Sequence, residues 1–166
     1  MKICTSVTDF VKSREESGKS VGFVPTMGAL HAGHESLVRK SVEENETTVA
    51  SIYVNPTQFD NQNDLAAYPE TLEQDQRIFE SLGVDLLLIP TFEQMYPDGF
   101  RYQVLETEFA RNLCGAHRDG HFTGVLTIVM KLLNIVRPNR AYFGEKDYQQ
   151  YLLIRDMVDT FFMDVE

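Results

Sequence analysis

Several features that would indicate particular protein classes are scarce in this sequence of 166 residues. It has only two cysteines, Cys4 and Cys114, which are too few for a disulfide framework, so we expect both to be reduced and buried as small apolar residues. No apolar run approaches the ~20 residues of a membrane-spanning helix. The N-terminus lacks the basic-then-apolar pattern of a signal peptide, because Asp9, Glu15 and Glu16 come early. These absences predict a cytoplasmic protein with no membrane partner.

Positive charge is also scarce. The sequence has 15 lysines and arginines against 25 aspartates and glutamates, which gives a net charge of −10 at pH 7. This balance argues against nucleic acid or an anionic membrane surface as the main partner. It does not exclude a phosphate ligand, because a few local donors can outweigh a distant negative surface. The length and ordinary composition predict one globular domain over residues 1–166.

Strand-like and helix-like segments alternate along the chain. Short runs of apolar or β-branched residues precede segments with helical spacing, and Gly83 and Pro138 mark the ends of two of the helices. This alternation predicts an α/β fold with a mainly parallel sheet and helices on both faces. The expected strands are residues 21–25, 48–54, 84–89 and 140–143, the expected helices are residues 33–45, 71–82, 124–136 and 147–162, and residues 163–166 have the pattern of a further strand.

The main functional signal is a pair of histidines where the first of these strands meets its helix. His31 and His34 flank Gly33, and their spacing places both side chains on one side of a first helical turn. Gly33 lets a ligand approach the backbone, and the helix start offers free N–H groups and a positive dipole end that attract phosphate. Imidazoles there can donate hydrogen bonds to phosphoryl oxygens. The segment indicates a nucleotide site, but histidines at this spacing are also common in structural and surface positions.

Two further polar segments follow expected strands. In residues 143–150, Lys146 can neutralise phosphate charge and Asp147 can bind a ribose hydroxyl, although such a turn could equally be solvated. In residues 55–59, Gln58 supplies an amide and Phe59 an aromatic ring. Ligands of parallel sheets bind beyond the carboxyl ends of the strands. The three segments are therefore expected to meet at one edge of the sheet.

Taken together, the motifs resemble those of the pantothenate synthetase (pantoate–β-alanine ligase) family, within the superfamily of nucleotidyltransferases and class I aminoacyl-tRNA synthetases. The resemblance implies a Rossmann-like nucleotide-binding domain over residues 1–166, with a chain end near the domain boundary and the family's small C-terminal domain absent from this chain. The matching segments are residues 25–34 (PTMGALHAGH), 51–59 (SIYVNPTQF), 64–69 (DLAAYP), 95–99 (MYPDG), 120–125 (GHFTGV) and 143–150 (FGEKDYQQ).

The resemblance also implies an activity. The family is a ligase of pantothenate biosynthesis, on the route to coenzyme A, and condenses pantoate with β-alanine. It uses ATP and Mg²⁺, forms an enzyme-bound pantoyl adenylate, and releases AMP and pyrophosphate. A homodimer is implied as well. Poor turnover by this chain alone is expected, because the family's segment that covers the phosphates would be missing.

Residue roles follow from the same resemblance. It implies that His31, His34 and Lys146 are catalytic, while the ligands of Mg²⁺ are not indicated. ATP is expected to contact Met27, Gly33, His34, Gly144, Lys146 and Asp147, and pantoate to contact Met27, Gln58, Phe59, Val129 and Gln150, with Tyr68 as a further candidate at the pocket mouth.

Other functions are left open by the sequence. Another His-x-Gly-His nucleotidyltransferase, acting on a phosphate, would need basic residues where Gln58 and Gln150 stand. A metal-dependent hydrolase could use the four histidines, but His117 and His121 are separated by a glycine-containing segment that favours a loop, and no carboxylate partner is evident. A chain that binds nucleotide without turnover is the third alternative.

Overall fold

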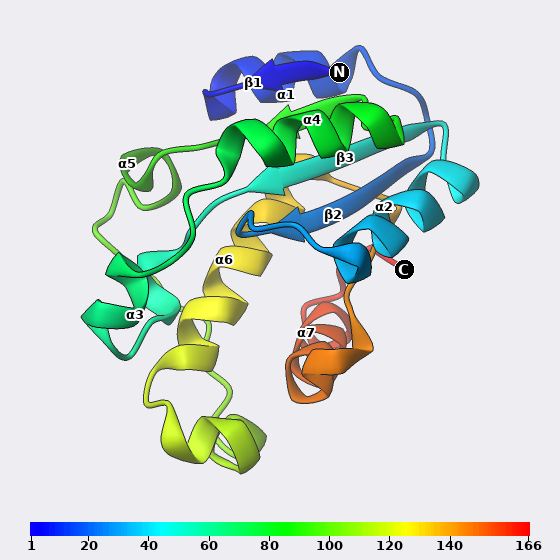
Figure 1. Cartoon of the computed structure of the whole chain (residues 1–166). Helices are drawn as coiled ribbons and strands as arrows, with labels where there is room; N and C mark the ends of the chain where they lie inside the picture. Colours follow the sequence, from blue (N-terminus) through cyan, green and yellow to red (C-terminus); the bar gives the residue numbers. More distant parts are fainter.

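Five parallel strands form one sheet, with helices on both faces (Figure 1). The computed structural model describes all residues from 1 to 166. The strand order is β1-β4-β3-β2-β5. None of the helices combines the length and the apolar character that a membrane span requires. The expected α/β fold with a parallel sheet is confirmed.

The element bounds agree with the sequence pattern at every expected strand and helix before residue 163, with ends shifted by a few residues. The elements that the sequence did not predict are the first strand and helix and the short helices. The strands are β1 (Lys2–Cys4), β2 (Val21–Thr26), β3 (Thr47–Ile52), β4 (Leu86–Leu88) and β5 (Arg140–Ala141), the α-helices are α1 (Val7–Glu15), α2 (Ala32–Glu44), α3 (Gln62–Ala66), α4 (Leu72–Leu82), α5 (Phe92–Met95), α6 (His121–Val136) and α7 (Tyr148–Thr160), and the 3-10 turns are η1 (Pro56–Gln58), η2 (Phe109–Arg111), η3 (Leu113–His117) and η4 (Glu145–Asp147).

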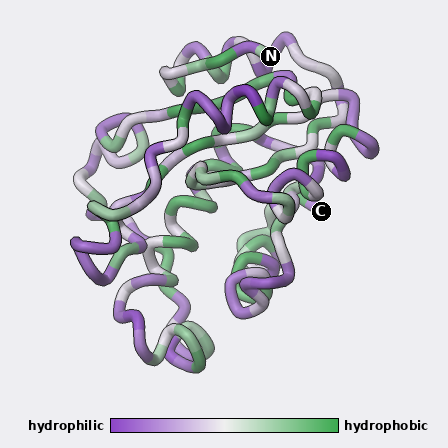
Figure 2. Tube along the Cα trace, viewed as in Figure 1, coloured by the Kyte–Doolittle hydropathy of each residue, from purple (hydrophilic) through white to green (hydrophobic).

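Side-chain alternation along the strands divides the core into two layers. Phe23 and Val49 face one side, where they pack with residues of α1, α6 and α7, whereas Val24 and Ala50 face α2 and α4 on the other. Both faces of the sheet are covered, so β4 and the middle of β2 and of β3 are apolar on both sides. In Figure 2 the central strands are mainly hydrophobic, while the outer helices alternate between hydrophobic and hydrophilic residues. This double burial fixes the carboxyl ends of the strands, where the site lies.

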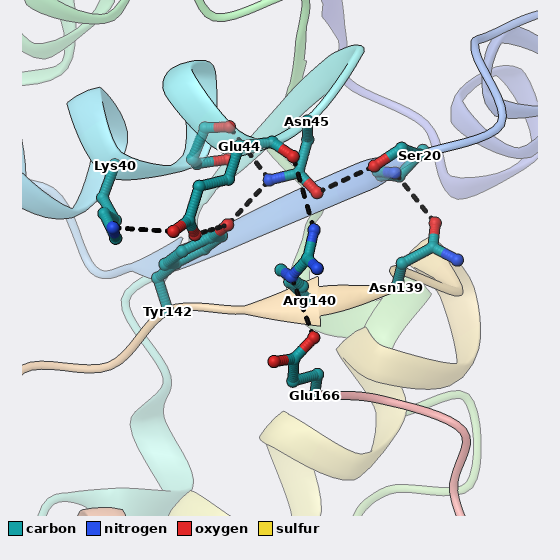
Figure 3. A network of polar contacts seen from close by, with 10 residues as sticks. Ser20, Lys40, Glu44, Asn45, Asn139, Arg140, Tyr142 and Glu166 are labelled. Carbon is teal, nitrogen blue, oxygen red and sulfur yellow. Dashed lines mark hydrogen bonds and ion pairs between the residues drawn. The ribbon is translucent and has the colours of Figure 1, made fainter.

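A polar network joins β5 to α2 near the amino ends of the strands (Figure 3). The amide of Asn45 accepts from the hydroxyl of Ser20 (3.1 Å) and donates to the hydroxyl of Tyr142 (2.7 Å). The Tyr142 hydroxyl in turn donates to Glu44 (2.9 Å). These bonds satisfy the polar groups at the end of α2 and hold it against the sheet.

The chain end touches the free edge of β5. The N–H of Glu166 donates to the carbonyl of Asn139 (2.9 Å), and its own carbonyl accepts from the N–H of Ala141 (2.8 Å). This is the bonding pattern of a parallel pair. The strand expected over residues 163–166 is therefore present only as this single paired residue, because residues 163–165 make no ladder bonds to β5.

The two cysteines differ in exposure. Cys4 is buried in β1, whereas Cys114 lies exposed in η3. The expectation that both are buried is wrong for Cys114, because the segment between α5 and α6 consists of short turns on the surface rather than core elements. The two are free thiols.

Candidate active site

A cavity of about 180 Å³ opens beyond the carboxyl ends of β2 and β3. The segment after β2, the turn η1, the helix α6 and the start of α7 all contribute to its wall. Segments far apart in the sequence therefore meet at one edge of the sheet, as predicted. The residues singled out from the sequence that line it are Met27, His34, Gln58, Tyr68, Val129, Asp147 and Gln150.

The remaining predicted residues lie beside this cavity rather than in its wall. His31 contacts His34, with ring centroids 4.1 Å apart. Phe59 packs edge-on against Tyr68, which lines the cavity, with ring centroids 5.9 Å apart. Gly33 lies between the two histidines, and Gly144 and Lys146 are exposed around η4.

Gln58 enters the cavity with an oriented amide. Its Oε1 accepts a hydrogen bond from the amide of Asn55 (3.1 Å), and its Nε2 donates to the sulfur of Met27 (3.2 Å). One N–H of the amide remains free for a ligand. Gln150, on the first turn of α7, lines the same cavity. Two amides that can donate and accept are suited to orienting a small polar molecule.

His31 is the N-cap of α2. Its Nδ1 accepts a hydrogen bond from the backbone N–H of Gly33 (3.1 Å). One of the N–H groups that we expected to be free for phosphate is therefore already bonded to a side chain. A Cβ on Gly33 would lie 2.9 Å from Cε1 of the His31 ring, so this glycine makes room for the ring. Because Nδ1 accepts, the proton of neutral His31 is on Nε2, where it can be donated to a ligand.

His34 is half-buried, and its Nδ1 has no hydrogen-bond partner. Burial lowers the pKa of His34 from its ordinary value, and the adjacent His31 lowers it further. The ring is therefore neutral at pH 7. A buried nitrogen without a partner beside the cavity is a group that a bound ligand can satisfy.

The loop that leads into α2 is held by Asp75, which the sequence analysis missed. This carboxylate, 2% exposed on α4, accepts from the backbone N–H groups of Ala29 (2.9 Å) and Leu30 (2.9 Å) and from the hydroxyl of Thr71 (2.8 Å). The loop needs such support, because Ala29 has a positive φ of 51°. The signal was present, since Asp75 falls on the same helical face as Phe79.

Two other cavity residues were also missed as site residues. The amide of Asn55, 1% exposed, donates to Gln58 and to the carbonyl of Gly124 (3.2 Å), and its oxygen accepts from the hydroxyl of Tyr96 (2.9 Å). Tyr53 brings to the cavity a buried hydroxyl without a hydrogen-bond partner, and burial raises the pKa of this phenol. Their positions directly after β3, beside Gln58, were the available signal.

Asp147 stands at the N-cap position of α7, yet its side chain makes no capping hydrogen bond. Its carboxylate lines the cavity and is free to accept from a ligand hydroxyl. No Lys or Arg lines this cavity. Lys146, the cation that the sequence suggests for neutralising phosphate, directly precedes Asp147 but does not line the cavity.

The histidines do not support a metal-dependent hydrolase. No group of three or more His, Cys, Asp or Glu side chains is placed to hold a metal ion. His117 is exposed at the end of η3, and His121 is buried at the start of α6, with Gly120 in a left-handed conformation between them. They do not share a helix face, which agrees with the loop expected there.

The sequence matches a known family over its full length. The family model of pantoate-beta-alanine ligase matches residues 1–166. The chain belongs to the pantoate-β-alanine ligase family. The pantothenate synthetase of Bdellovibrio bacteriovorus is 52% identical over 165 residues, which cover 99% of this chain and 66% of that relative. The pantothenate synthetase of Legionella pneumophila (strain Lens) is 51% identical over 168 residues, with 100% and 67% covered.

Solved structures of the family have the same fold. The pantoate-β-alanine ligase of Francisella tularensis, complexed with β-γ ATP and β-alanine, has a TM-score of 0.97 at 47% identity, and the similarity covers 100% of this chain and 65% of that one. The pantothenate synthetase of Thermus thermophilus has a TM-score of 0.93 at 46% identity, with 100% and 60% covered. The chain thus spans roughly two thirds of the length of the relatives it matches.

Proposed function

We propose that this chain carries the substrate site of an enzyme that condenses pantoate with β-alanine, with conversion of ATP to AMP and pyrophosphate. The observation that carries the proposal is the convergence of Gln58, Gln150, His34 and Asp147 on one cavity in a member of this family. The complex of the Francisella tularensis relative with a form of ATP and β-alanine supports these ligands for the chain.

The proposed reaction has two steps. A carboxylate is a poor acylating agent, so an oxygen of pantoate first attacks the α-phosphorus of ATP, and the bond to pyrophosphate breaks. The amine of β-alanine then attacks the carbonyl carbon of the pantoyl adenylate, a proton leaves the nitrogen, and AMP departs. No step requires a covalent bond to the protein, so the protein's task is to position the reactants and to stabilise charge.

Pantoate is assigned to the cavity. The amides of Gln58 and Gln150 would orient its hydroxyl and carboxylate groups, and Met27 and Val129 would contact its methyl groups. The absence of Lys and Arg from the lining favours a carboxylate substrate, held by neutral amides, over a phosphorylated one. Tyr68 would close the mouth, supported by the ring of Phe59.

ATP is assigned to the region between the starts of α2 and α7. The Nε2–H of His31, the ring of His34 and the ammonium of Lys146 would donate to phosphoryl oxygens as negative charge shifts during displacement. Asp147 would accept from a ribose hydroxyl, because its carboxylate is free of capping bonds. Met27, Gly33 and Gly144 would contact the nucleotide through the backbone. A Cβ on Gly144 would meet nothing within 4 Å, so the approach there is open.

Mg²⁺ is proposed to enter with ATP. Mg²⁺ in such sites is held by one or two carboxylates together with substrate phosphates and water, rather than by a cage of protein ligands. The chain is compatible with that arrangement, because it has no preformed group of three or more metal-binding side chains, so that phosphate oxygens and water would supply most of the ligands. When bound, the ion would neutralise phosphate charge. A homodimer and a cytoplasmic location complete the proposal by analogy with the family.

The proposal is tested by coupled binding. The affinity of the chain for ATP is measured by calorimetry under three conditions: without a second ligand, with saturating pantoate, and with a hydroxy acid that lacks the two methyl groups. We expect pantoate to raise the ATP affinity and the smaller acid to leave it unchanged, and Gln150→Leu to remove the effect of pantoate. Equal effects of the two acids, or none from either, would show that the cavity is not a pantoate site.

A further inference from the structure

His121 begins α6 directly beneath the turn that carries Gln58. It is 7% exposed, and its ring makes two hydrogen bonds within the protein. Nδ1 lies 2.7 Å from the backbone carbonyl oxygen of Gln58, and Nε2 lies 3.1 Å from Nη1 of Arg118. The proposed reaction makes no use of this residue.

The chemistry of the two partners determines the protonation state of the ring. A backbone carbonyl can only accept, so Nδ1 must carry a proton; a guanidinium can only donate, so Nε2 must offer its lone pair. Both requirements are met by one state alone, the neutral Nδ1–H tautomer. Burial lowers the pKa of His121; the bond to the Gln58 carbonyl opposes this shift, and the positive charge of Arg118 adds to it. The charged groups around the ring are Arg118, Asp60, whose carboxylate lies 3.8 Å from Nε of Arg118, and Asp147.

The hydrogen bond from His121 is part of a wider attachment of η1 to α6. Asn55 donates to the carbonyl of Gly124, as described above. A Cβ on Gly124 would lie 2.4 Å from the carbonyl oxygen of Thr57 and 2.7 Å from Cα of Gln58, so the helix and the turn are in direct backbone contact. The backbone contact and the hydrogen bond from Asn55 thus fix the distance between η1 and α6. His121, in contrast, holds the peptide group of Gln58 itself.

We propose that His121 is a positioning residue for the substrate amide of Gln58, which it holds through an Nδ1–H bond to the Gln58 carbonyl, with Arg118 fixing the tautomer. The assignment of pantoate to Gln58 rests on the proposed function. The loss of the bond frees the Gln58 peptide to rotate, which moves the amide in the cavity. In catalytic sites, misplacement of a positioning group by an ångström can lower the reaction rate by up to about a hundredfold. Pantoate binding should therefore depend on His121, and ATP binding much less.

The test uses three variants of the chain. His121→Ala removes the donor, and His121→Asn keeps an N–H donor near the position of Nδ1. His117→Ala is the matched control, because His117 is an exposed histidine of the same segment. The readouts are the ring ¹⁵N shifts of His121 at pH 7, the carbonyl ¹³C shift of Gln58 in the ligand-free chain, and the affinities for pantoate and ATP.

We expect the ring shifts to report a proton on Nδ1 and a lone pair on Nε2. His121→Ala should shift the Gln58 carbonyl resonance and weaken pantoate binding roughly tenfold, with ATP affinity changed by less than about twofold. His121→Asn should restore most of the original Gln58 carbonyl shift and most of the pantoate affinity. His117→Ala should match the unmodified chain in both.

An Nε2–H tautomer, or a Gln58 resonance that does not move in His121→Ala, would overturn the inference. So would equal losses of pantoate and ATP affinity, which would indicate a purely structural role. If His121→Ala does not fold, the tautomer and the Gln58 shift in His121→Asn decide the question. If the unmodified chain binds no pantoate, the proposed function fails, and the two spectroscopic readouts still test the contact between His121 and Gln58.

Discussion

The rings of His31 and His34 lie 4.1 Å apart, tilted by 33°, at the start of α2. Two imidazolium ions at this separation would repel each other, so the pair resists double protonation. Burial of His34 adds to this resistance. His34 is therefore neutral in the free protein at pH 7. The approach of an anionic ligand would favour its protonation, so binding of ATP should be accompanied by some proton uptake below about pH 6.5, the ordinary value for histidine.

The stability of the fold should fall as the pH drops below about 6.5, in part because of His34. Its folded-state pKa is lowered, so the unfolded chain binds more protons between the folded value and the ordinary value of about 6.5. The stabilisation is therefore complete above about 6.5 and is lost as the pH falls through the folded value. Between pH 7.5 and pH 5.5, the free energy of unfolding measured in urea should fall less in His34→Asn than in the unmodified chain. His117→Asn, at an exposed position, is the control, and an unchanged drop in His34→Asn would refute the prediction.

Removal of charge from Asp75 should loosen the loop that precedes the histidines. In Asp75→Asn the amide nitrogen must face one of the three donors that the carboxylate accepts, which leaves a buried donor unsatisfied. The expected cost is about 2 kcal/mol of unfolding free energy, with weaker ATP binding. Glu73→Gln is the control on the same helical turn, because Glu73 forms only an exposed ion pair with Arg77. Equal stability of the two variants in urea would contradict the role given to Asp75.

Gly124 should not tolerate a side chain. In Gly124→Ala the new Cβ would meet the carbonyl of Thr57 at 2.4 Å, so η1 has to move away from α6. A loss of about 2 kcal/mol is expected for such overpacking, which lowers the melting temperature by roughly 4–8 °C in a domain of this size. Gly144→Ala provides the comparison for stability alone, since its Cβ meets nothing within 4 Å. Melting temperatures that do not separate the two variants would argue against the close contact.

Lys146 should contribute to ATP binding although it lies outside the cavity. Lys146→Ala removes a charged donor to the phosphates, and a loss of about 1.5 kcal/mol in ATP binding is expected, or roughly tenfold in affinity. Lys40→Ala is the matched control, because Lys40 is exposed on α2 and pairs with Glu44 at 2.6 Å. Calorimetry that finds the same ATP affinity in both variants would remove Lys146 from the site.

The central fold could be predicted because its strands and helices carry strong local patterns. The unbroken apolar run around β4 and the glycine stop of α4 at Gly83 are both visible in the sequence. The missed strand β1 has only three residues and pairs with β4, far along the chain, so nothing local marks it. The wrong expectation for Cys114 has a similar origin, since residue type alone does not show whether an irregular segment is covered.

The site was predictable to the extent that it lies at strand ends. The rule that ligands bind beyond the carboxyl ends of parallel strands brought Gln58 and Gln150 together, and the cavity contains both. The residues that support the site were not found in this way. Asp75 and His121 act through backbone groups of other segments, and such contacts depend on tertiary packing rather than on any local motif.

The position of β1 has a consequence for how the chain folds. Lys2 pairs with Leu86 and Cys4 with Leu88, so the first residues of the chain form the outer strand beside β4. β1 cannot dock until β4, its only neighbour in the sheet, has been made, and long-range parallel pairing of this kind is slow. During synthesis β1 must therefore wait, unpaired, until the residues up to Leu88 have emerged. It thus joins the sheet only after three later strands exist.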